Sequence, residues 1–434
     1  MGTLAHSFFV MLPSLPATPI PFRQAGWPEA IMHCDADAFF LGCELKRSPE
    51  FKGRPAVVTG KLGGIVLAKS YDLKAKGVKT GMPIWEAKKI CPNLKVFPAD
   101  FQLYNGLSAK MFALLNEWTP DVEIYSVDEA FLDVKGMRRL RRMDYGQMAH
   151  AIKEDVKKKI GITVSIGVSV TKTLAKMASE YHKPDGVTVI SAKDIKDWLK
   201  KMPVKEVPGF GRNTVPLLEK YGIHTCADFV NLTQDTVRHL LHRPGVDLWK
   251  ELQGEKVHDV ERSFAANKSI TRTSSFEPQT SDQKFLWAHT VRQLERAIDA
   301  LHREQLLGRE IVLYLRDKDF RSYGWSYRLP TPSKSFPVFV DALKSLWKKY
   351  FPRGTVFRST GVNLLRLSPD GGTQFSLFED PGIILRRDSL EGAKDHIRER
   401  YGNLSILAAS ALSLKMLGPN TKNPIKAKAF NVEW

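Results

Sequence analysis

Two strand-like segments, each bordered by carboxylates, constrain this chain more than any other feature of its sequence. Ile31–Asp35 has the composition of a short buried strand, and a further aspartate, Asp37, follows it two residues later. Val122–Tyr125 and Ala130–Val134 have the pattern of two strands in a hairpin-like arrangement, and an acidic pair lies in the turn between them. If the strands are neighbours in one sheet, the two acidic turns converge on one spot.

Three carboxylates would meet at that spot: Asp35, Asp128 and Glu129. At close quarters they repel one another unless cations are present. Ligation by oxygen alone suits Mg²⁺ or Mn²⁺, and two such ions about 3.5–4 Å apart can activate a hydroxyl and stabilise a leaving oxygen in phosphoryl transfer. The alternative is a set of acidic turn residues that cap strands and helices. The D-x-D after a strand, together with a strand-flanked S-x-D-E, favours a metal site.

The distribution of charge points to a polyanionic partner. The formal net charge is +18, and residues 266–368 carry half of it, with 18 Lys and Arg against nine Asp and Glu. A concentrated positive field is what phosphate binding through counterion release requires. The alternative is a basic surface that serves solubility alone.

The remaining composition excludes several classes of protein. With 43% hydrophobic and 26% charged residues, the chain is neither wholly disordered nor collagen-like, and it lacks an apolar run long enough to span a membrane. Its four cysteines are scattered without a C-x-x-C pair, which argues against a disulfide scaffold and fits a reducing, cytoplasmic location. Residues 1–30 are proline-rich and lack the basic start of a secretory signal, so we expect a loose leader.

Strands and helices interleave over residues 31–190 as in a split β-α-β sheet, which predicts an α+β fold. Residues 191–262 have an all-helical pattern with a turn signal at Pro208–Gly211, and residues 268–368 mix helix and strand.

At its acidic motifs the chain resembles the Y-family translesion DNA polymerases, and both the DNA polymerase IV and the polymerase V catalytic-subunit groups fit. The resemblance covers residues 31–368 in family order and at family spacing. It rests on the strings Met32–Phe40, Ile65–Val78, Tyr125–Leu132, Ser165–Gly186 and Val207–Gly211.

The resemblance implies a right-hand polymerase with a ferredoxin-like palm, small fingers, a helical thumb with a helix-hairpin-helix, and an α/β little-finger domain. The expected bounds are palm 31–38 and 101–190, fingers 39–100, thumb 191–257, linker 258–267, little finger 268–368 and a C-terminal tail 369–434.

The same resemblance implies that Asp35, Asp128 and Glu129 are catalytic residues that hold two Mg²⁺ ions, with Mn²⁺ as an alternative and with the Ala36 carbonyl as a further ligand. The expected nucleotide site comprises a steric-gate ring at Phe40, which leaves no room for a 2′-hydroxyl, beside Phe39, and the triphosphate contacts Tyr71, Lys74 and Lys183. Lys74 departs from the usual arginine and lacks its bidentate fork. We expect Lys172 and Lys176 to be surface lysines or contacts to the DNA backbone.

Further residues are expected to bind DNA or a partner protein. Gly209 and Gly211 let backbone N–H groups approach a phosphate, and strand arginines contribute positive charge: Arg272, Arg316 and Arg328. Residues 374–378 resemble a sliding-clamp peptide, with Gln374 as the polar anchor and Leu377 and Phe378 as apolar plugs; the alternative is a strand fragment packed on the little finger.

The sequence therefore predicts a monomeric, template-directed DNA polymerase of low fidelity that performs translesion synthesis in DNA repair. Its expected partners are primer-template DNA, deoxyribonucleoside triphosphates and the sliding clamp, without a membrane. Two alternatives remain: a two-metal nuclease, and a non-catalytic DNA- and clamp-binding scaffold of the same fold.

Overall fold

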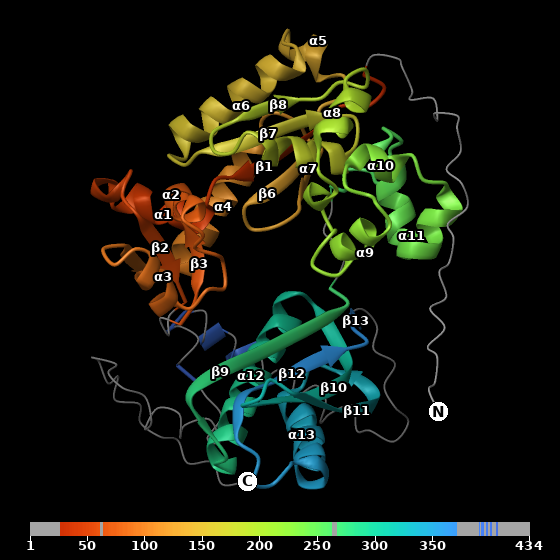
Figure 1. The fold of residues 1–434 in the computed structure, drawn as a ribbon. Coiled ribbons are helices and arrows are strands. Elements are labelled where there is room, and N and C mark those ends of the chain that lie inside the picture. Colours follow the sequence, from red (N-terminus) through yellow and green to blue (C-terminus); the bar gives the residue numbers. More distant parts are fainter. Residues whose placement is uncertain are drawn as a thin grey trace, which may run out of the picture. The chain divides into compact units, whose positions relative to one another are not determined.

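The computed structural model describes residues 27–60, 64–262 and 267–370, with scattered positions between 390 and 406. The chain divides into two compact units after residue 264, and each is described by itself (Figure 1). Most of the expected leader and of the expected tail lies outside the described residues. Within the part of the chain that the structure describes, no helix is both long and apolar enough to cross a membrane.

A five-stranded sheet in the order β5-β6-β1-β7-β8 organises the first unit. β1 lies at its centre and is antiparallel to both β6 and β7, so the prediction that the two acidic strands are neighbours is confirmed. The strands are β1 (Ile31–Ala36), β5 (Val122–Ile124), β6 (Glu129–Asp133), β7 (Val164–Ser169) and β8 (Val187–Val189).

Alternation along β1 gives the sheet two different faces. Met32 and Cys34 lie in the main hydrophobic core, which also contains apolar residues of α4 (Phe101–Asn116) and α6 (Tyr145–Lys159). Ile31 belongs to a small cluster on the opposite face, with a residue of α7 (Lys172–Tyr181). Because His33 and Asp35 share the parity of Ile31, their side chains face α7.

Helix α7 packs unusually close to this face because β7 carries a glycine there. Gly167 is the register partner of His33. A Cβ atom at Gly167 would overlap the backbone of α7, at the Ala175 carbonyl oxygen and the Ser179 nitrogen. The glycine therefore allows α7 to reach the polar side chains of β1.

Two smaller groups of elements complete the first unit. A three-stranded sheet, β3-β2-β4, has a core of its own; its elements are α1 (Phe39–Arg47), η1 (Pro49–Phe51), β2 (Ala56–Thr59), β3 (Val66–Lys69), α2 (Tyr71–Ala75), α3 (Ile84–Ile90) and β4 (Lys95–Pro98). A helical cluster with a second core follows β8; it comprises α8 (Ile195–Lys201), η2 (Val204–Glu206), α9 (Thr214–Lys220), α10 (Cys226–Val230) and α11 (Gln234–Leu252). The short helix α5 (Met137–Arg141) connects β6 to α6.

The second unit is a sheet in the order β11-β10-β12-β9, with β13 paired to β10. Two helices contact it, and its buried core includes Ile311 and Leu313 from β10. The elements are β9 (Ser269–Thr280), α12 (Gln283–Arg303), β10 (Leu306–Asp317), β11 (Ser322–Ser333), α13 (Phe336–Tyr350), β12 (Phe357–Leu365) and β13 (Ser368–Pro369). The predicted α+β class is confirmed, since each unit combines a sheet with helices that pack on it.

Replacing Gly167 with alanine tests the close approach of α7. We expect Gly167→Ala to lower the free energy of unfolding by more than about 3 kcal/mol, because the new methyl group forces the α7 backbone away from β7. Gly106→Ala is the matched control, since Gly106 is an exposed position of α4 where a Cβ meets nothing within 4 Å. Urea denaturation measures both variants. Equal stability of the two variants would contradict the proposed packing.

Candidate active site

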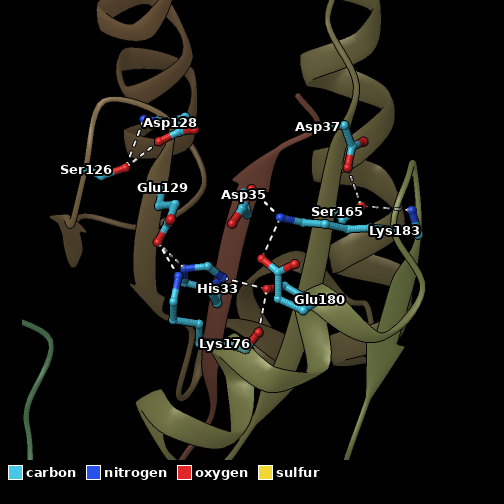
Figure 2. A network of polar contacts seen from close by, with 12 residues as sticks. His33, Asp35, Asp37, Ser126, Asp128, Glu129, Ser165, Lys176, Glu180 and Lys183 are labelled. Carbon is cyan, nitrogen blue, oxygen red and sulfur yellow. Dashed lines mark hydrogen bonds and ion pairs between the residues drawn. The ribbon is translucent and has the colours of Figure 1, made fainter. Parts of the chain in front are cut away.

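Asp35 and Glu129 lie directly opposite each other on neighbouring strands. They are register partners across β1 and β6, and Asp35 is only 4% exposed. Together with His33 they form a group whose potential ligand atoms all lie within 4.8 Å of one another (Figure 2). The strand pairing therefore brings two of the three predicted carboxylates together at the end of β1.

The third predicted carboxylate points elsewhere. Asp128 precedes β6, and its side chain accepts a hydrogen bond of 2.5 Å from the Ser126 hydroxyl (Figure 2). Among the described residues the group around Asp35 does not include it. Its backbone oxygen accepts a hydrogen bond of 3.0 Å from the Ala36 nitrogen, which joins the two acidic turns through the main chain.

The second aspartate of the D-x-D motif, Asp37, is held by hydrogen bonds from three groups. The Ser165 hydroxyl and the Asp185 backbone nitrogen each donate to it at 2.8 Å, and the Tyr71 hydroxyl lies 3.4 Å away. Asp37 thus fixes the loop after α7 to the end of β1, a structural role that agrees with its less direct place in the motif.

His33 belongs to the site, although the sequence analysis did not select it. Its ring is fully buried, with Nε2 3.3 Å from a Glu129 carboxylate oxygen and Nδ1 2.7 Å from the Ser179 hydroxyl. Burial lowers the pKa of His33 to about 4, so the imidazole is neutral at neutral pH. In the tautomer that carries its proton on Nε2, the neutral ring donates to the ionised Glu129 carboxylate and holds it in place. The sequence feature that could have identified His33 is its position two residues before Asp35, which places both side chains on the same face of the strand.

Two lysines and an additional glutamate complete the network in Figure 2. The Lys183 ammonium lies 2.6 Å from Asp35 and 2.6 Å from Glu180, and the Lys176 ammonium is paired with Glu129. Lys176 is therefore not a free surface lysine.

Lys172 likewise differs from its expected place on the surface. Its ammonium lies 2.7 Å from the Glu123 carboxylate, and both side chains are largely buried. This ion pair joins α7 to β5.

The site holds an excess of negative charge. Three carboxylates, Asp35, Glu129 and Glu180, pair with the ammonium groups of two lysines, and the Asp128 carboxylate lies close enough to feel the charges of Glu129 and Lys183. Burial raises the pKa of Asp35, with the charges of Glu180 and Glu129 adding and Lys183 opposing, and burial also raises the pKa of Asp128. For Glu129 burial acts in the same direction, but the hydrogen bonds from His33 and Lys176 outweigh it and hold the pKa at about 2. Such a cluster of oxygen donors fits a hard divalent cation.

The predicted nucleotide-binding residues occupy different environments. Phe39 is 3% exposed and lies in the main core, so of the two adjacent rings only Phe40 is partly exposed. The Phe40 ring stacks on Tyr104 with centroids 4.7 Å apart. Lys74 is exposed, and its ammonium lies 5.8 Å from the Tyr71 ring centroid.

The glycine turn of the helical cluster has the conformation that its sequence requires. Gly209 has a φ of +90°, a backbone conformation that residues other than glycine rarely adopt. At Gly211, no heavy atom lies within 4 Å of the position that a Cβ atom would take. Gly211 is exposed, so its backbone is open to solvent.

The predicted DNA-binding arginines divide between the two faces of the second sheet. Arg316 and Arg328 share the face that carries Val312, because the register pairs Val312 with Ser326 and Glu310 with Arg328. Arg272 pairs with the buried Val362, so it faces the helices, where the charges of Arg296 and Arg303 on α12 act on it. Arg272 therefore lies on the other face of the sheet from Arg316 and Arg328. The segment 374–378 lies outside the described residues.

The fold and the acidic cluster together define a right-hand polymerase. Residues 34–180 match the impB/mucB/samB family, and residues 267–377 match the C-terminal domain of that family. The chain is 33% identical to DNA polymerase IV of Moorella thermoacetica over 88% of this chain and 96% of that protein. It is 29% identical to DNA polymerase IV 1 of Bacillus subtilis over 94% of this chain and 98% of that protein.

Solved structures agree with this assignment. A Y-family DNA polymerase chimera, Dbh-Dpo4(243-245)-Dbh, superposes with a TM-score of 0.67 at 25% identity, over 78% of this chain and 99% of that chain. An insertion ternary complex of Dbh DNA polymerase superposes with a TM-score of 0.57 at 25% identity and the same coverage. The chain belongs to the Y family of translesion DNA polymerases.

Proposed function

We propose that this protein is a template-directed DNA polymerase of low fidelity that copies damaged template bases. The observation that carries the proposal is the buried, strand-paired couple Asp35 and Glu129 in a site with excess negative charge, within a chain of the Y family. This favours the polymerase over the non-catalytic scaffold, which has no use for such a cluster. The two-metal nuclease is not favoured, because the similar proteins carry polymerase names.

We propose Mg²⁺ as the cofactor, with two ions held by Asp35, Asp128, Glu129 and the Ala36 carbonyl. The donor set supports this choice, since carboxylate and carbonyl oxygens are the ligands of hard cations. The ions would supply charge stabilisation on the attacking and leaving oxygens of the transfer. His33 and Lys176 keep Glu129 ionised and oriented, and a rotation of Asp128 away from Ser126 would complete the ligand set.

The remaining roles concern the incoming nucleotide. Phe40 would lie under the sugar and exclude a 2′-hydroxyl, with Tyr104 behind it as support. Lys183, Lys74 and Tyr71 would hold the triphosphate. Lys183 already lies at the carboxylates, so it can move between Asp35 and a phosphate oxygen. In the transfer, the primer 3′-hydroxyl attacks the α-phosphate and pyrophosphate leaves.

DNA contacts would come from both units. The open face of the second sheet offers Arg316 and Arg328 among hydroxyl-bearing side chains such as Thr271 and Ser326, a surface suited to phosphates without reading sequence. The turn at Gly209 and Gly211 would add backbone N–H groups.

The remaining partner assignments rest on the sequence. We propose that residues 374–378 dock on a sliding clamp through Gln374, Leu377 and Phe378. We further propose that the protein acts as a monomer in the cytoplasm. The similar DNA polymerase IV proteins come from bacteria, whose DNA lies in the cytoplasm.

Primer extension with Mg²⁺ and four deoxyribonucleotides tests the proposed activity. We expect extension by the wild type and a loss of at least about 10³-fold in rate for Asp35→Asn and Glu129→Gln, because each removes a charge at the reacting phosphate. Glu86→Gln, an exposed glutamate of α3, is the matched control and should retain full activity. Primer-template binding, measured by fluorescence anisotropy, should persist in all variants. Shortened primers would indicate the nuclease, and binding without extension by the wild type would indicate the scaffold.

The division of the arginines gives an independent prediction for DNA affinity. We expect Arg316→Gln/Arg328→Gln to weaken primer-template binding about tenfold or more and to reduce its salt dependence, because two phosphate contacts are lost. Arg272→Gln removes a charge of the same type from the helix-covered face and should change affinity less than about twofold. Anisotropy titrations at several salt concentrations measure both. A larger loss from Arg272→Gln than from the double substitution would overturn the assignment of faces.

A further inference from the structure

A second cluster of positive charge lies far from the candidate active site. Helix α5 and the residue after it contain four arginines within five positions: Arg138, Arg139, Arg141 and Arg142. They follow β6, whose first residue is Glu129 and whose last is Asp133. Since β6 runs across the sheet, α5 lies at the opposite end of the sheet from the carboxylates. In Figure 1 α5 lies at one end of the unit, beside α6.

Three of these arginines, Arg138, Arg139 and Arg142, line a hollow of about 750 Å³. Its lining consists of Gly136, Arg138, Arg139, Arg142, Met143, Asp144 and Tyr145. The one acidic member, Asp144, is already used, because its carboxylate accepts the Gln147 backbone N–H in a capping box at the start of α6. The hollow is therefore strongly basic.

The arginines differ in their availability. Arg141 donates to the backbone oxygens of Glu117 and Trp118 and lies over the Trp118 ring, so it stabilises the end of α4. Arg138, Arg139 and Arg142 are exposed, and none of the ion pairs found among the described residues involves them. Arg138 is ordered by the face of the Tyr145 ring, at 5.4 Å from its centroid. Three guanidinium groups are thus free to bind an anionic partner.

An apolar residue accompanies this charge. Leu140 is 72% exposed in the middle of the arginines, and Met143 contributes to the wall of the hollow. A DNA backbone presents phosphates and offers nothing for an exposed leucine to bury. Arginine, methionine and aromatic residues around a hollow are typical of a site that receives a peptide side chain. The hollow lies at the opposite end of the sheet from the carboxylates. A protein bound there would not compete with the primer terminus for the active site.

We propose that the hollow beside α5, lined by Arg138, Arg139, Arg142 and Met143, together with the exposed Leu140 of the same helix, docks an acidic segment of a partner protein that inserts an apolar side chain. The carboxylates of the segment pair with the three free guanidinium groups, which are suited to bidentate recognition. The apolar side chain packs against Leu140 and Met143.

Fluorescence anisotropy of two short labelled peptides with the full chain tests this proposal. Both peptides are rich in Asp and Glu; one contains a Leu-Phe pair, and the other has Ser at those two positions. The patch variant Arg138→Glu/Arg139→Glu/Arg142→Glu leaves Arg141 intact, and its fold is checked by thermal denaturation. Lys348→Glu/Lys349→Glu/Arg353→Glu makes the same charge change at exposed positions of the second unit. Leu140→Ser removes the apolar contact without changing charge.

We expect the wild type to bind the Leu-Phe peptide at least about tenfold more tightly than the Ser peptide, with the patch variant losing at least about tenfold in affinity and the control variant nearly none. Leu140→Ser should remove most of the preference for the Leu-Phe peptide. Primer-template affinity should be the same in the patch variant and the wild type. Equal binding of both peptides, equal losses in the patch and control variants, or a parallel loss of DNA affinity in the patch variant would each overturn the proposal, the last by assigning the surface to DNA.

Discussion

The antiparallel pairing of β1 with β6 is the constraint on which the rest of the site depends. It sets Asp35 opposite Glu129 on one sheet face, and like charges in directly opposed positions destabilise a sheet. The fold accepts this cost because His33, Lys176 and Lys183 offset part of it. The part that is not offset is an excess of negative charge, which a divalent cation can neutralise. The uncompensated charge lowers the stability of the folded protein, and it gives the site affinity for the divalent cations that phosphoryl transfer needs.

Helix α7 and the loop directly after it supply the two compensating lysines, Lys176 and Lys183. Lys176 and Glu180 lie four positions apart on one face of this helix, and Ser179 and the following Lys183 lie beside them. All reach the carboxylates only because Gly167 lets the helix backbone approach β7. One residue without a side chain therefore determines where the charged side chains of another element lie. The polar network and the packing of the sheet are consequences of the same close contact.

Much of this arrangement could be predicted from the sequence, and the exceptions have physical reasons. Strand β1, the hairpin of β5 and β6, and the meeting of Asp35 with Glu129 follow from short apolar runs that border acidic residues. The role of His33 and the environment of Lys176 could not be predicted, because they depend on which helix covers that face of the sheet. The local sequence pattern does not specify which helix this is. The face on which Arg272 lies could not be predicted either, because it depends on the register of β9 with β12, which a shift of one residue would invert.

The most direct test of the account is to count the cations that the carboxylate pair binds. Electron paramagnetic resonance of free Mn²⁺ can be followed during titration of the protein with primer-template, whose primer lacks a 3′-hydroxyl, and a matched deoxyribonucleoside triphosphate. The account predicts two protein-dependent Mn²⁺ ions per chain for the wild type and a loss of at least one for Asp35→Asn and for Glu129→Gln. The same number of bound ions in the wild type and both variants would contradict it, because the paired carboxylates would then not be the ligands.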